Sequence, residues 1–136
     1  MKHKFIFIGL LFLIIFSITF FDNGRNTTLE GKISEIIKND SSTSINIKSL
    51  TSFPWNKAYL FAPYTPQEKI NKQLGVKFKD ASKIYKRDDI YLLVFLNADS
   101  VIHYSEIKRQ HCDFYIKDDN QITPSNSTIK IKRYNQ

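Results

Sequence analysis

The sequence predicts an α+β protein: an N-terminal membrane helix followed by a small antiparallel sheet with two helices packed on one side. An apolar stretch, residues 5–21, broken only by Gly9, Ser17 and Thr19, lies near the start of the chain. After it, short apolar runs alternate with turn residues, and their caps and spacing predict the order α-β-β-α-β-β-β-β. A chain of 136 residues has room for one small domain beside the apolar stretch.

Residues 5–21 are typical of a membrane anchor. Seventeen helical residues span about 25 Å, slightly less than a bilayer's apolar core of about 30 Å. A cleaved signal peptide ends in small residues, whereas this stretch ends in Phe20 and Phe21, and no lipid-anchor cysteine follows it. We therefore expect a signal anchor over residues 1–24 and an extracytoplasmic domain over residues 25–136. Secretion after cleavage is the alternative.

Charge sets the expected orientation of this anchor. Lys2 and Lys4 precede the span, so the positive-inside bias leaves the N-terminus in the cytoplasm and the rest outside a single-pass cell membrane. The net charge of the chain is +7, and its 42% of apolar residues excludes a disordered or collagen-like class. One cysteine excludes a disulfide framework within the chain.

The first half of the domain shows one helix and two strands. Thr27 as N-cap and Glu30 form a capping box. The apolar residues that follow share one helical face: Leu29, Ile33, Ile36 and Ile37. Ser44–Ser49 alternates isoleucine with polar residues, which predicts a half-exposed strand. Lys57–Tyr64 is apolar on both faces, as in a central strand, and the strand must end before Pro63, which cannot donate to a ladder.

The second half begins with the strongest local signal in the chain. Four residues mark its helix: Thr65 as N-cap, Pro66 at the first helical position, Glu68 in a capping box and Gly75 at a left-handed end. Residues 77–89 are polar and basic, which predicts a loop with one helical turn. Residues 90–96 form the most apolar run of the domain and predict a central strand. Shorter strands are expected at residues 101–105, 113–116 and 129–132.

Residues 53–66 read Phe-x-Trp-Asn-Lys-x-Tyr-x-Phe-x-Pro-Tyr-Thr-Pro, and Leu74-Gly75 follows. This pattern resembles a group of small exported bacterial proteins, many of them lipid-anchored, which show Trp-Asp-Lys, an aromatic strand and Pro-Tyr-Thr. The likeness covers about residues 45–116. It implies an extracytoplasmic location and a small α+β domain, and no activity. The chain departs from the group in Asn56, where Asp is common, and in lacking the lipid-anchor cysteine.

The residues offer little catalytic chemistry. A thiol enzyme would need Cys112 beside an oriented imidazole, and His103 is the candidate because His111 and Cys112 point to opposite faces of a strand. A buried, unreactive cysteine is the simpler interpretation. The spacing of His, Cys and Asp fits no metal signature, and no phosphate loop or dinucleotide fingerprint is present. We therefore expect no metal and no cofactor.

A run of cations provides the candidate binding site. It contains Lys69, Lys72, Lys77, Lys79, Lys83, Lys86 and Arg87. A solvated face is one interpretation, and contact with anionic lipid or a cell-wall polymer is the other. Nucleic acid is not expected outside the cell. Trp55 and Tyr64 are candidate members of an aromatic binding strip, although a tryptophan beside a proline is often a core residue.

Together these observations predict a membrane-anchored extracytoplasmic accessory or binding domain that contacts anionic surfaces. An enzyme that uses Cys112 and His103 is the alternative of a different class, and a secreted factor with a cleaved signal peptide is the third.

Overall fold

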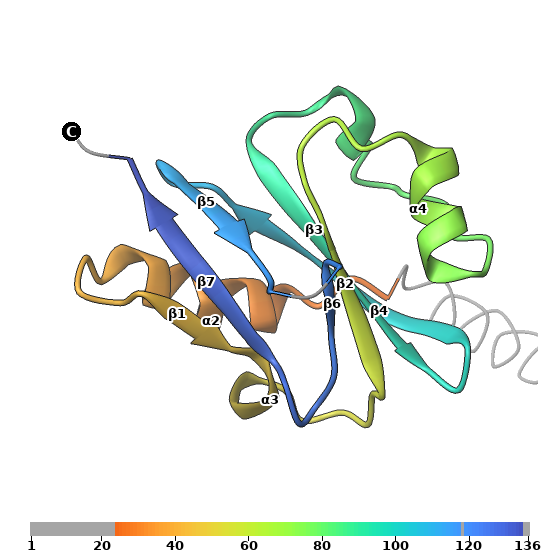
Figure 1. Cartoon of the computed structure of the whole chain (residues 1–136), viewed down its shortest axis with the longest axis horizontal. Coiled ribbons are helices and arrows are strands. Elements are labelled where there is room, and N and C mark those ends of the chain that lie inside the picture. The colour runs from red at the N-terminus through yellow and green to blue at the C-terminus, as the bar shows by residue number, and fades with distance from the viewer. Residues whose placement is uncertain (1–23, 118, 135–136) are drawn as a thin grey trace, which may run out of the picture.

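The computed structural model describes residues 24–117 and 119–134 (Figure 1). The expected membrane helix at residues 5–21 lies outside them. Among the described residues, no helix is both long and apolar enough to cross a membrane. The elements in order are α2 (Thr27–Lys38), β1 (Ser44–Asn46), α3 (Ile47–Leu50), β2 (Lys57–Phe61), α4 (Gln67–Leu74), the 3-10 helix η1 (Ile84–Lys86), β3 (Ile90–Asn97), β4 (Ser100–Lys108), β5 (Cys112–Tyr115), β6 (Gln121–Ile122) and β7 (Thr128–Arg133).

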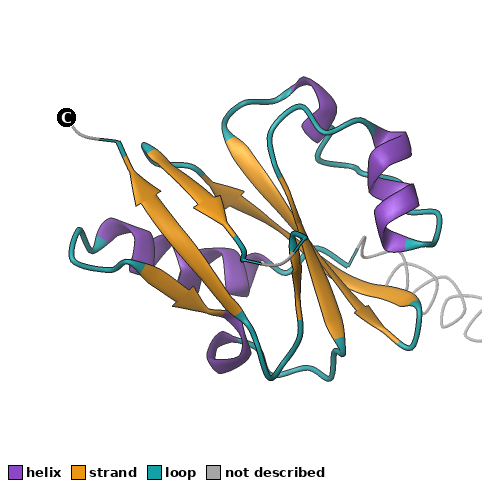
Figure 2. Ribbon diagram, viewed as in Figure 1, coloured by secondary structure: helices purple, strands orange, loops and turns teal. Residues whose placement is uncertain are grey.

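The strands form two antiparallel sheets (Figure 2). One has the order β4-β3-β2-β6, and the other has the order β1-β7-β5. The α+β class and the antiparallel pairing are confirmed, whereas the expected single sheet is wrong. The two-residue strand β6 has no alternating pattern long enough to be recognised in the sequence.

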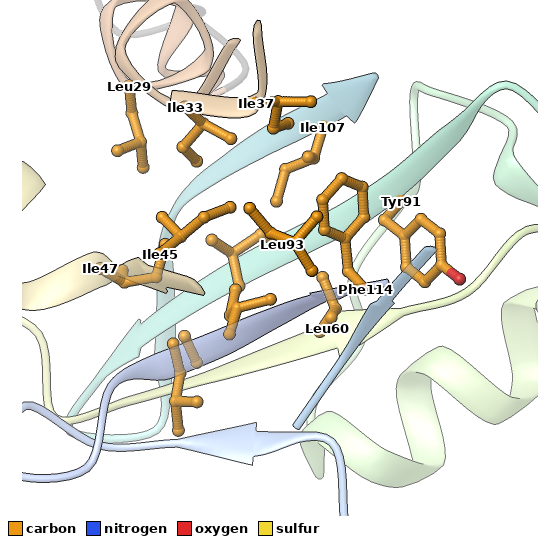
Figure 3. Close-up of a cluster of buried hydrophobic side chains, with 14 of the residues drawn as sticks. Leu29, Ile33, Ile37, Ile45, Ile47, Leu60, Tyr91, Leu93, Ile107 and Phe114 are labelled. Carbon is orange, nitrogen blue, oxygen red and sulfur yellow. The ribbon is translucent and has the colours of Figure 1, made fainter. Parts of the chain in front are cut away.

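The helices lie on opposite faces of the four-stranded sheet, not on one side as expected. On one face, the apolar residues of α2 pack with Leu93 and Ile107 and with the second sheet, and Figure 3 shows Leu29, Ile33 and Ile37 pointing toward the strands. On the other face, Ile70 and Leu74 of α4 pack with Phe61, Leu92 and Val94. Because β3 is apolar on both faces, both need a covering layer, and the two helices divide that role.

Helix caps differ in detail from the expected capping boxes. Asn26, not Thr27, caps α2, because its side chain accepts from the backbone N–H of Leu29 at 2.9 Å. The Thr65 hydroxyl donates to the Ala62 carbonyl at 2.6 Å, so it closes the preceding turn and does not cap α4. The left-handed Gly75 at the end of α4 is confirmed, with φ of 74°.

The strand predicted over Ser44–Ser49 is only half that length in the structure. Only Ser44–Asn46 is extended, because the Asn46 side chain accepts from the backbone of Ser49 and begins the single turn of α3. Ile47 points into the core from that turn and is fully buried. An alternation over six residues therefore arises here from a short strand and one helical turn.

Candidate functional site

The chain segment that follows the apolar stretch is bound to the edge of the sheet. Arg25 forms a parallel bridge with Tyr104 of β4, whose backbone N–H donates to the Gly24 carbonyl at 2.9 Å. The Asn26 N–H in turn donates to the Tyr104 carbonyl at 2.8 Å. Gly24 has φ of 68°, and a Cβ there would lie 3.1 Å from the Ile102 carbonyl oxygen. Residues 24–26 are thus part of the fold.

An ion network continues from this junction along β4. Arg25 contacts the carboxylates of Glu30 and Glu106, and Glu106 also binds Nη1 of Arg87 at 2.6 Å. Arg87 binds Asp89 through two hydrogen bonds of 2.8 Å. The bond to Glu30 raises the pKa of Arg25, and the bond from Arg87 lowers the pKa of Asp89. These ion pairs link Arg25, Glu106 and Arg87 into one network along β4.

Glu30 also binds the backbone of β4, the edge strand of the sheet. Its Oε1 accepts the backbone N–H of Glu106 at 2.9 Å, which β4 would otherwise leave unpaired. The expected capping box would have turned this carboxylate back to its own helix. The structure instead uses it to join α2 to β4.

A cavity of about 310 Å³ lies between α2 and β4. The ion network closes one end, and a hydrogen bond of 2.9 Å from Gln110 to Ser34 crosses between α2 and the chain just after β4. Ile33, Ile37 and Ile90 contribute its apolar lining, and Lys108 is an exposed cation of the lining that lies outside the ion network described above. Its two carboxylates are engaged by arginines, so neither is free to act as a general acid or base.

The predicted run of cations does not form one surface. Lys69 and Lys72 lie on α4 beside Asp119, where they line a cavity of about 750 Å³ near the β6 edge. At this cavity, the Gln73 side chain of α4 donates a hydrogen bond of 2.9 Å to the Asp119 carbonyl. Arg87 is engaged in the ion network and is not a free cation.

Lys77 and Lys79 lie near the junction. They are exposed and alternate with Val76 and Phe78, which are partly buried. The Phe78 ring packs on Tyr104 with centroids 5.7 Å apart, and the Tyr104 backbone is the group that holds Gly24. Lys77 and Lys79, here called the proximal lysines, therefore come close to the point where the described chain begins.

Lys83 and Tyr64 lie toward the other end of the four-stranded sheet. The Tyr64 N–H donates to the Ile84 carbonyl at 2.9 Å, which joins the loop after β2 to η1. η1 contacts β3, which begins at Ile90 and there pairs with Lys108, the last residue of β4. The segment therefore runs down α4, turns at Gly75 and returns, so that its lysines are spread over the length of the sheet.

The aromatic strip is not formed. Trp55 is 5% exposed, its ring lies against Phe95 with centroids 5.3 Å apart, and its indole N–H donates to the Thr51 hydroxyl at 3.0 Å. Tyr59 is also buried, whereas Tyr64 is 59% exposed. Trp55 is thus a core residue, and Tyr64 is the member of the expected pair that faces solvent.

His103 and Cys112 lie at opposite ends of α2. His103 Nδ1 is 3.2 Å from the Gly24 carbonyl, just before the helix begins. Cys112 is buried, and its Sγ is 3.5 Å from Nη1 of Arg133, which also donates to the Ile37 carbonyl in the last turn of the helix. A 12-residue helix is about 18 Å long, so the imidazole cannot reach the thiol. The pair that an enzyme would need does not form.

A polar cluster that the sequence analysis missed joins β5 to the end of the chain. Asp113 accepts from Tyr91 at 2.9 Å and from Arg109 at 2.7 Å, and the Tyr134 hydroxyl also donates to it. Burial and the bond to Asp113 raise the pKa of Tyr91 to about 12. Burial alone would raise the pKa of Asp113, but its three donors outweigh burial and lower it. The partners of Asp113 lie 4 to 22 residues from it in sequence, so no local sequence pattern identifies this cluster.

No family model, no curated protein and no solved structure matches the chain. Within residues 24–117 and 119–134, no three His, Cys, Asp or Glu side chains are grouped as metal ligands. The features of this chain that bear on function are therefore its junction, its charges and its exposed surface.

Proposed function

We propose that this protein is a membrane-anchored extracytoplasmic accessory or binding domain whose proximal lysines contact an anionic membrane surface. The observation that carries the proposal is the junction. Residues 24–26 are hydrogen-bonded to β4, and the apolar stretch expected to be the anchor ends at residue 21. A domain joined to its anchor by as few as two residues, 22 and 23, stands close to the bilayer.

The charge near the junction supports the contact. Lys77 and Lys79 point outward from a segment whose alternate residues pack on the core, so their charges are presented by a fixed backbone. A cation near an anionic leaflet is worth about 1 kcal/mol. Two lysines thus favour the docked orientation by about 2 kcal/mol, and reversing both to glutamate replaces that attraction with repulsion of similar size.

The test uses the full-length protein in lipid nanodiscs of defined composition. Acylation of individual lysines by an uncharged amine-reactive reagent is followed by mass spectrometry, in neutral discs and in discs with phosphatidylglycerol. Lys77 and Lys79 should react several-fold more slowly in anionic discs, and about 0.5 M salt should remove the difference. Lys83 and Lys86, in the same segment but at its other end, are the internal control.

A second arm uses charge reversal. The variant Lys77→Glu should weaken the protection of Lys79 by anionic lipid, and Lys79→Glu should weaken that of Lys77. The variant Lys83→Glu, which carries the same change of charge, should leave both intact. Equal reactivity of the proximal lysines in neutral and anionic discs would refute the contact. Recovery of the protein in the soluble fraction of cells, starting near Gly24, would refute the anchor.

A further inference from the structure

Two residues in the described chain have backbone conformations that their sequence does not explain. Six of the eight non-glycine residues with positive φ come as consecutive pairs in tight turns between strands: Ala98 and Asp99, Gln110 and His111, and Asp119 and Asn120. The other two stand alone: Tyr64 with φ of 64° and Lys83 with φ of 54°. A bulky residue in this region is strained, and such strain persists only where the surroundings impose it.

The two strained residues are neighbours in space. The Tyr64 N–H donates to the carbonyls of Ile84 at 2.9 Å and Arg87 at 3.2 Å, so the turn that contains Lys83 holds the loop that contains Tyr64. Buried Asp80 fixes that turn by accepting the backbone N–H groups of Ser82 and Ile84 at 2.9 and 2.8 Å. Both strained positions thus belong to one rigid arrangement of two loops.

This arrangement presents aromatic and cationic side chains to solvent. Tyr64 is 59% exposed and Tyr85 is 53% exposed. Lys83 and Lys86 are exposed and close to Tyr85 in sequence, in the turn whose Ile84 carbonyl accepts from the Tyr64 N–H. These four residues are here called the distal surface. Of the two adjacent carboxylates, Asp89 is bound by Arg87 and Asp88 is exposed, so the lysines outnumber the unpaired acid. Exposed tyrosines fixed beside cations mark a surface suited to an anionic partner with apolar faces.

The distal surface lies away from the junction. Gly24 is held at the level of Tyr104, which pairs with Val94, whereas η1 lies against the start of β3 near Ile90. At about 3.3 Å per residue, these levels are roughly 13 Å apart along β3, and η1 and Tyr64 lie at the far end of that distance. The distal surface is therefore separated from the junction and from the proximal lysines along the strand direction of the sheet.

We propose that the distal surface binds an anionic glycan polymer of the cell envelope, in which phosphodiester or carboxylate groups alternate with sugar rings. Lys83 and Lys86 pair with the anionic groups, and the rings of Tyr64 and Tyr85 pack on the apolar faces of the sugars. The inference rests on the proposed extracytoplasmic location. The binding itself depends on neither the anchor nor the proximal lysines, so it can fail or succeed independently of them.

The experiment measures binding of soluble polymers to the full-length protein in neutral nanodiscs, where the proximal contact is absent. The probes are purified poly(glycerol phosphate) teichoic acid with sugar substituents, a carboxylate-bearing glycan, neutral dextran and inorganic polyphosphate, each titrated at about 50 mM salt. We expect binding of one or both anionic glycans, none of dextran, and weaker binding of polyphosphate, which lacks sugars. Preference between the two glycans identifies the anionic group.

Variants assign the binding to the distal surface. Lys83→Glu with Lys86→Glu should weaken it by about tenfold or more, because each reversed charge acts on a polyanion. Tyr64→Asn should weaken it several-fold without unfolding the protein, since asparagine tolerates the left-handed region. Lys77→Glu with Lys79→Glu has the same change in net charge and should leave it unchanged.

Three outcomes would overturn the proposal. Failure of both anionic glycans to bind would refute the proposal. So would an equal loss of binding in the proximal and distal reversals, since net charge alone would then explain the affinity. Equal binding of polyphosphate and glycan, with no effect of Tyr64→Asn, would reduce the surface to a nonspecific cation patch. Protection of Lys77 and Lys79 by anionic lipid is unaffected by any of these results, so the two proposals are tested separately.

Discussion

Glu106 occupies the centre of the ion network, and replacing it with glutamine should destabilise the domain by about 2 kcal/mol. The side chain of Glu106 is 10% exposed and accepts from both Arg25 and Arg87. Loss of a buried ion-pair partner costs about 3–5 kcal/mol when the remaining charge has no other ligand. Here the arginine side chains are 44% and 32% exposed and keep Glu30 and Asp89, so solvent and the second partners reduce that cost.

Trp55 provides the assay. It is the one tryptophan of the chain and is buried against Phe95, so its emission reports on the folded core. Full-length protein in neutral detergent, unfolded by heat, should show a fall in Tm of about 8 °C for Glu106→Gln, since 1 kcal/mol corresponds to about 4 °C in a domain of this size. Chemical denaturation should give a matching shift of midpoint with an unchanged slope.

Glu35→Gln is the matched control for this variant. Glu35 pairs with Lys38 on α2 at 3.1 Å, but both side chains are exposed, at 75% and 61%. Exposed pairs of this kind are worth about 0.3–0.5 kcal/mol, so the control should move Tm by no more than about 2 °C. If Glu106→Gln and Glu35→Gln were equally stable, the network would be a surface feature, and the argument that it fixes the junction would fail.

Three further variants test other parts of the fold. The lowered pKa of Asp113 adds stability that is complete above about pH 4 and is lost as pH falls through the folded pKa, so Asp113→Asn should flatten the acid limb of Tm against pH. Tyr91, with its pKa raised to about 12, adds stability that is complete below about pH 10, so Tyr91→Phe should flatten the alkaline limb. Gly31→Ala should raise stability by about 1 kcal/mol in urea titrations, because the position is exposed in α2 and an added Cβ meets no atom within 4 Å. A lower midpoint would instead mean that the methyl group disturbs the cavity between α2 and β4.

Local patterns predicted most of the helices and strands because each pattern lies within a few residues. The run at residues 90–96, for example, lies wholly within β3, and Gly75 ends α4 as expected. Local patterns do not determine which sheet a strand joins. β5 pairs with β7, more than ten residues later, and not with its predecessor β4, so a correct set of strands still allowed the wrong number of sheets. No alternation of side chains within one strand can specify its partner.

The candidate site was harder to predict for a related reason. Lys77 and Lys83 are six residues apart in sequence, yet the chain turns after α4 and carries them toward different ends of the sheet. Conversely, Arg25 and Glu106 are distant in sequence and touch in the structure. A charge run in a sequence predicts one charged surface only while the chain keeps one direction, and the turn at Gly75 already separates Lys69 and Lys72 on α4 from the lysines that follow.

The junction determines whether the two proposed contacts compete or act together. A domain on a flexible tether would turn either its proximal or its distal cations toward the bilayer. The two orientations would have similar free energies, because each is stabilised by the contacts of two lysines. Hydrogen bonds from Tyr104 to Gly24 and from Asn26 to Tyr104, with Arg25 held by two carboxylates, instead hold residues 24–26 on the sheet. On the proposed anchoring, only residues 22 and 23 separate the apolar stretch from this held segment. We therefore expect the proximal lysines to engage lipid while the distal surface stays available for a second anionic partner. Inserting a flexible segment before Gly24 should allow membrane and polymer to compete, whereas the native junction should keep the two binding events independent.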